Sequence, residues 1–121
     1  MKVNIGISDK NRKCVAEILN QLLADEYVLY TKTRNYHWNV TGSDFSELHK
    51  FFESQYEELD DIIDEVAERA RSLGGVSFGS LAEFLKHTKL KETSGSFLAA
   101  QKMIAHLLTD HEALIGRLRE N

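Results

Sequence analysis

Four side chains that can bind a transition metal share one predicted helix at helical spacing. His49 and Glu53 are four residues apart, and so are Asp64 and Glu68. In a helix this separation places two side chains on one face, one turn apart. A fifth candidate, His37, precedes this helix. Imidazole together with carboxylate suits iron, manganese or zinc, and carboxylates able to bridge favour an oxidisable pair of ferrous ions.

The two pairs cannot bind one metal ion within a single straight helix. Asp64 lies eleven positions beyond Glu53, which returns it to within about 20° of the same direction but places it roughly 16 Å further along the axis. First-row metals bind side-chain nitrogen and oxygen at about 2 Å. Either two separate sites exist, or an antiparallel copy of the helix from a second subunit brings the pairs together. A two-fold axis would do this and create two equivalent sites per dimer.

Each residue type also has an interpretation that involves no metal. Asp64 and Glu68 lie in a strongly acidic stretch, so for these two residues taken alone a solvated helical face is favoured over metal binding. For His49 taken alone, an interpretation without metal is likewise favoured. His37 is placed to interact with the negative end of a helix dipole.

Several other residues are interpreted as structural. The pattern predicts that His111 is a hydrogen-bonded core or interface residue and that His106 lies on a solvated helical face. Tyr36 and Trp38 are expected in the core. Periodicity and composition therefore indicate a helical bundle in which a metal site is one open interpretation.

Composition favours one all-α domain over residues 1–121. Apolar residues make up 42% of the chain, charged residues 28%, and proline is absent. The net charge of −4 offers no broad cationic surface for nucleic acid. The single Cys14 cannot form an internal disulfide, and neither a signal peptide nor a membrane-spanning run is evident. We therefore expect a soluble protein of the reducing cytoplasm.

Three long amphipathic helices are predicted. The first runs from a Ser8-Asp9 cap to about Trp38, and the second opens with a capping box at Asp44 and Glu47 and ends at Gly74-Gly75. The second helix would be roughly 45 Å long. A short helix over 81–87 follows, and a third long helix begins after Ser96. Its expected buried face is Ile104, Leu107, Leu108, His111, Leu114, Ile115 and Leu118. This pattern predicts a four-helix bundle without its fourth helix, with a short crossover helix.

Ordered motifs along nearly the whole chain resemble one known family. They are Asn35-Tyr36-His37-Trp38-Asn39-Val40-Thr41-Gly42, then Phe45, Leu48-His49, Phe52-Glu53, Asp64-Glu65-Val66-Ala67-Glu68-Arg69-Ala70, Leu73-Gly74-Gly75 and Thr109-Asp110-His111-Glu112-Ala113-Leu114-Ile115. Together they resemble the DNA-binding protein from starved cells (Dps) family, the ferritin-like mini-ferritins.

The resemblance implies an iron site between two-fold-related subunits. His37, His49 and Glu53 would come from one subunit, and Asp64 and Glu68 from the other. The family carries Asp or Glu at the position of Glu53, so we expect this residue to bind iron. The resemblance further implies oxidation of Fe(II) to Fe(III), preferentially with hydrogen peroxide, and storage of the ferric mineral in a hollow dodecamer.

Two departures from the family pattern keep other functions open. Some relatives bind DNA through a Lys-rich tail, whereas basic residues near this N-terminus are only Lys2, Lys10, Arg12 and Lys13. The family also has a further C-terminal helix, and this sequence stops before it, so we expect an open apolar groove. The alternatives are a non-enzymatic DNA-compacting protein and an incomplete helical assembly without activity.

Overall fold

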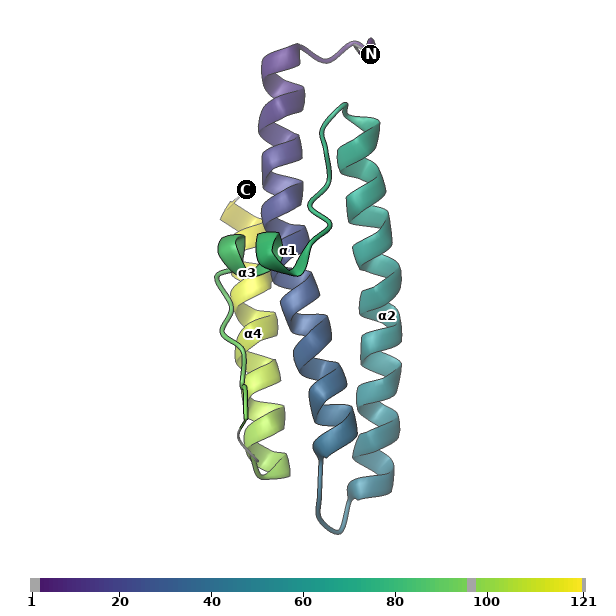
Figure 1. The fold of residues 1–121 in the computed structure, drawn as a ribbon, viewed down its shortest axis with the longest axis vertical. Helices are drawn as coiled ribbons and strands as arrows, with labels where there is room; N and C mark the ends of the chain where they lie inside the picture. Colours follow the sequence, from purple (N-terminus) through teal and green to yellow (C-terminus); the bar gives the residue numbers. More distant parts are fainter. Residues whose placement is uncertain (1–2, 96–97, 121) are drawn as a thin grey trace.

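Every regular element of the computed structural model, which describes residues 3–95 and 98–120, is a helix (Figure 1). The helices are α1 (Asp9–Asn39), α2 (Phe45–Ser72), α3 (Leu81–His87) and α4 (Ala100–Glu120). α2 runs antiparallel to α1, α3 crosses the bundle near its middle, and α4 runs antiparallel along another side of α1 (Figure 1). The predicted all-α, ferritin-like arrangement with a short crossover helix is confirmed.

The capping box predicted at the start of α2 is wrong. Asp44 is the N-cap residue, but its side chain makes no capping hydrogen bond and its backbone is not extended (φ −98°, ψ 19°). It belongs to a tight turn in which the Phe45 N–H donates to the Gly42 carbonyl. Since a side-chain cap normally requires an extended N-cap backbone, this turn prevents it. A capping box forms instead at α3, between Ser80 and Glu83.

α1 is the central helix of the bundle. Its backbone lies against α2, α3 and α4, whereas no Cα atom of α2 lies within 8 Å of a Cα atom of α4 in the described part of the chain. The larger hydrophobic cluster joins all three long helices and contains Val28, Leu29, Tyr36, Val40, Phe52, Leu59, Leu90, Met103, Leu107 and Leu114. A second cluster lies beneath α3 and contains Leu23, Ala24, Ile63 and Phe84. The core therefore fixes the rotation of both α2 and α4 about α1.

The predicted buried face of α4 is only partly right. Leu107 and Leu114 are buried as expected, together with Met103 and Asp110. Four other members of that face are substantially exposed: Ile104 (42%), Leu108 (58%), Ile115 (54%) and Leu118 (50%). The reason is that α1 is the only helix whose backbone lies close to α4 in the described chain, so a single stripe of α4 is covered. Over the described residues, no helix is long and apolar enough to cross a membrane.

Candidate metal centre

Two histidines lie side by side at the end of the bundle where α1 connects to α2. His37 lies in the last turn of α1 and His49 in the second turn of α2, and the antiparallel helices bring the two residues side by side. Their rings stack with centroids 3.7 Å apart. His37 is 6% exposed and His49 is half-buried. The tertiary structure therefore brings together two predicted ligands that are twelve positions apart in sequence.

Reciprocal hydrogen bonds fix the orientation of both rings. Nδ1 of His37 lies 2.6 Å from the His49 carbonyl oxygen, and Nδ1 of His49 lies 2.7 Å from the His37 carbonyl oxygen. A carbonyl can only accept, so each Nδ1 carries the proton and donates. In a neutral ring the lone pair is then on Nε2. Metal-binding histidines are commonly oriented in this way, with the second nitrogen donating to a carbonyl or a carboxylate.

The carboxylates predicted to complete the site are distributed along α2. Glu53 is half-buried one turn beyond His49, whereas Asp64 and Glu68 are exposed toward the other end of the helix. In the described ranges, 3–95 and 98–120, no three His, Cys, Asp or Glu side chains are grouped closely enough to hold a metal ion. A single copy therefore presents an oriented histidine pair, with acidic side chains available on the same helix.

Aromatic side chains surround the histidine pair, and two of them were not anticipated from the sequence. Tyr56 contacts His37 edge-on with ring centroids 5.2 Å apart, and Phe45 stacks on His49 at 5.1 Å. Tyr56 is seven residues beyond His49, so helical periodicity could have placed both on one face. Trp38, predicted in the core, is 62% exposed.

The positively charged side chain of Arg34 lies against aromatic side chains next to the histidine pair. The Arg34 guanidinium carbon is 4.3 Å from the centre of the Tyr56 ring and 5.5 Å from that of Trp38. Nε of Arg34 also donates to the Tyr30 hydroxyl at 2.8 Å. That hydrogen bond is the main cause of a raised Arg34 pKa. The cation is therefore held on the aromatic side chains, where ring quadrupoles attract it.

Glu26 and His111 are among the residues outside the histidine pair that have a buried polar atom without a hydrogen-bond partner in the described chain. Oε2 of Glu26 is buried without a hydrogen-bond partner in the described chain. Burial, with the neighbouring Asp25 charge, raises the pKa of the Glu26 carboxyl to about 7. Nε2 of His111 is likewise buried without a partner in the described chain. The hydrogen bond predicted for a core His111 is therefore not found at this atom. Nothing in the sequence distinguishes Glu26 from the other glutamates, because its burial is a property of the fold.

Comparison with known proteins agrees with this architecture. Residues 16–121 match the ferritin-like domain family. A DNA protection during starvation protein of Brevibacillus brevis is 40% identical over 108 residues, covering 89% of this chain and 72% of the relative. This chain belongs to the Dps family of ferritin-like proteins. An uncharacterized low temperature-induced protein of a Nostoc species is 47% identical over 120 residues, covering 99% of this chain and 67% of that protein.

Solved structures place the Dps-family chain in the same fold. A Dps protein from Vibrio cholerae, described as a member of a broad superfamily of ferritin-like diiron-carboxylate proteins, superposes with a TM-score of 0.92 at 35% identity. The superposition covers 99% of this chain and 76% of the Vibrio chain. DpsC from Streptomyces coelicolor gives a TM-score of 0.96 at 27% identity, covering 99% of this chain and 70% of that one.

Proposed function

We propose that this Dps-family chain is a ferroxidase subunit that oxidises Fe(II) at a site shared by two copies and retains the Fe(III) product. The observation that carries the proposal is the stacked pair of His37 and His49, whose Nδ1 atoms are both hydrogen-bonded to carbonyls. This arrangement leaves two oriented Nε2 ligands at one end of α2. In the proposal Glu53 lies beside them, while Asp64 and Glu68 come from the partner copy.

The proposed iron site requires two copies of the chain because α2 is long. The histidine pair and the Asp64–Glu68 pair are separated by several helical turns within one copy, so they cannot meet at one ion. Placing α2 against an antiparallel copy about a two-fold axis pairs each end with the other. Two equivalent sites then form per dimer. A larger hollow assembly of twelve subunits is part of the same proposal, as is retention of the ferric mineral within it.

Iron is the substrate in this reaction, with hydrogen peroxide as the proposed oxidant. Two Fe(II) ions supply the two electrons that cleave the O–O bond, so that two Fe(II), one hydrogen peroxide and two protons give two Fe(III) and two water molecules. Paired oxidation therefore avoids release of hydroxyl radical. The protein contributes the oriented imidazoles and carboxylates, whose hard oxygen atoms favour the ferric product.

Complementation between two inactive variants tests the shared site. We expect His49→Ala and Asp64→Ala each to oxidise anaerobically added Fe(II) much more slowly than the parent after peroxide is added. When the two variants are co-assembled in equal amounts, half of the dimers are mixed and each mixed dimer has one intact site. Activity should therefore recover to about a quarter of the parent value.

Glu57→Ala, an exposed acid of α2 outside the proposed ligand set, is the matched control and should retain full activity. If the two inactive variants recover nothing on co-assembly, although a mass measurement shows mixed dimers, the site is not shared. If the double variant His49→Ala with Asp64→Ala oxidises iron as fast as the parent, the ligand assignment is wrong.

A further inference from the structure

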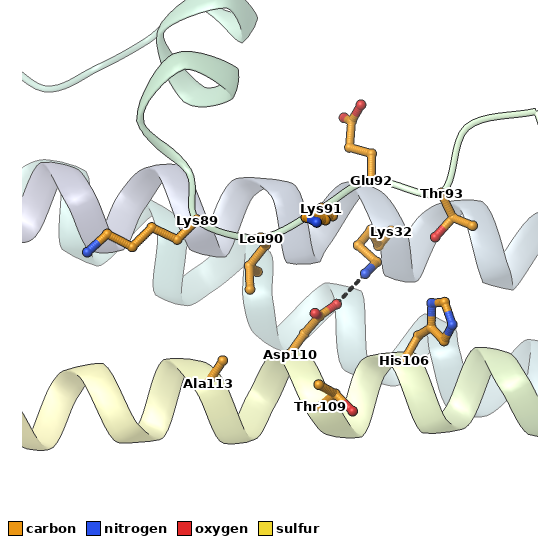
Figure 2. Close-up of a pocket in the computed structure, with 10 residues that line it drawn as sticks. All are labelled: Lys32, Lys89, Leu90, Lys91, Glu92, Thr93, His106, Thr109, Asp110 and Ala113. Atoms are coloured by element: carbon orange, nitrogen blue, oxygen red, sulfur yellow. Dashed lines mark hydrogen bonds and ion pairs between the residues drawn. The ribbon is translucent and has the colours of Figure 1, made fainter.

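A cavity of about 580 Å³ lies away from the histidine pair, between α1, α4 and the extended segment 89–93. Figure 2 shows its walls: Lys32 projects from α1, His106 and Asp110 rise from α4, and the extended segment crosses above them. Its volume is within the range of small-molecule sites. None of the residues proposed to bind iron lines it.

The lining of this cavity is cationic in a chain whose net charge is −4. Three lysines, Lys32, Lys89 and Lys91, line it together with the two carboxylates of Glu92 and Asp110. Figure 2 shows the Glu92 side chain directed away from the Lys32 and Asp110 pair. Figure 2 also shows Lys89 directed away from that pair, so two lysines, Lys32 and Lys91, remain beside one acid, Asp110.

Lys32 is the unusual member because it is a charged side chain in the interior. It is only 5% exposed, and its Nζ lies 2.5 Å from Oδ2 of Asp110. An ammonium has three N–H donors, and in the described chain this contact is its one hydrogen bond to protein. Asp110 thus holds the ammonium in place at the cavity wall. The remaining N–H groups can satisfy their hydrogen-bonding capacity with an acceptor in the cavity.

The other polar groups of the cavity also include donors. Figure 2 shows His106 and the Thr93 hydroxyl on opposite sides of the gap between α4 and the extended segment. The Thr93 hydroxyl lies 2.8 Å from the Tyr36 hydroxyl. If Tyr36 donates in that contact, the Thr93 proton is available to a ligand. Thr109 contributes no donor, because its hydroxyl donates back to the Ala105 carbonyl.

We propose that this cavity binds a small phosphate-bearing anion. Lys32, Lys91, His106 and Thr93 all line the cavity and carry N–H or O–H donors for a phosphate group, and lysine is a common phosphate-binding side chain. Because Lys32 and Asp110 neutralise each other, the attraction for an anion comes from Lys91 and from the remaining N–H donors of Lys32, whereas the one carboxylate near them is already paired. The bound anion would join segment 89–93 to α4. Inorganic phosphate and a phosphate ester share this chemistry, and the volume of the cavity accommodates either.

Binding is measured by ³¹P NMR titration and by the shift in melting temperature with inorganic phosphate, against sodium chloride at matched ionic strength. A ligand that binds only the folded state stabilises it by mass action, so we expect a saturable rise in Tm with phosphate and none with chloride. A second titration with glycerol phosphate distinguishes the two sources. Tighter binding of glycerol phosphate than of phosphate assigns the site to esters, and the reverse order assigns it to the free ion.

Lys91→Gln is the test variant, since Lys91 is exposed and its replacement should not disturb folding. Loss of one charge-assisted contact should weaken phosphate binding about tenfold. Lys86→Gln removes the same charge from α3, outside the cavity, and should bind as the parent does. The proposal is overturned if neither phosphate compound gives a saturable response, or if both lysine variants lose the same affinity. Parallel losses would mean nonspecific attraction to positive charge.

Discussion

Ionisation of the buried Glu26 carboxyl should contribute a loss of stability as the pH rises from about 4.5 to above 7. Glu26 is 7% exposed on α1, and its Oε2 has no partner within the described residues. Replacement by glutamine keeps the shape of the protonated side chain and removes the ionisation. We therefore expect Glu26→Gln to stabilise the fold above pH 7 and to change little near pH 4.

The magnitude follows from the pKa, which burial and then the Asp25 charge raise from 4.5 to about 7. Between these values the folded state binds a proton that the unfolded state has released, so stability falls as pH rises through this range. Below pH 4.5 the residue is protonated in both states and contributes nothing. Above pH 7 the full cost is present, about 3 kcal/mol at about 1.4 kcal/mol for each tenfold change in the ionisation constant.

Urea denaturation of the parent and of Glu26→Gln at pH 4.5 and pH 8, at one fixed protein concentration, measures this difference. The free-energy gain of the variant should be about 3 kcal/mol at pH 8 and near zero at pH 4.5. Glu17→Gln, an exposed glutamate of the same helix, should show no such pH-dependent gain. An equal gain at both pH values, or none at pH 8, would refute the assignment of a buried, protonated Glu26.

Two further predictions concern packing and the buried ion pair. Lys32→Met should destabilise the protein by about 3 to 5 kcal/mol in a denaturation experiment, since it leaves the Asp110 carboxylate buried and unpaired. Combining it with Asp110→Leu should restore most of the lost stability. If the double variant is no more stable than the single one, the pair is not the cause. Gly75→Ala should lower Tm, because a Cβ atom at position 75 would lie 2.9 Å from the Ala16 Cβ and 3.3 Å from the Ala70 carbonyl oxygen. An unchanged Tm would contradict this prediction and would show that α1 can shift to make room.

Much of the fold was predictable from local pattern. The start of α1, the short helix over 81–87 and the end of α2 near Gly74 follow from capping residues, apolar periodicity and glycine, which act within a few residues of chain. Gly74 has a positive φ of 89°, a conformation that few other residues adopt readily. The His49 and Glu53 spacing likewise places both residues on one face of α2 before any tertiary contact is known.

The sequence by itself determined which side chains share a helical face, because periodicity is a property of one helix about its own axis. Which face becomes covered depends on neighbouring helices, so only the tertiary structure decided that Trp38 and Leu108 are exposed while Lys32 is buried. The reciprocal hydrogen bonds of His37 and His49 are equally tertiary, since each ring needs the carbonyl of the other helix. The antiparallel packing of α1 and α2 thus converts two separate histidines into one oriented pair.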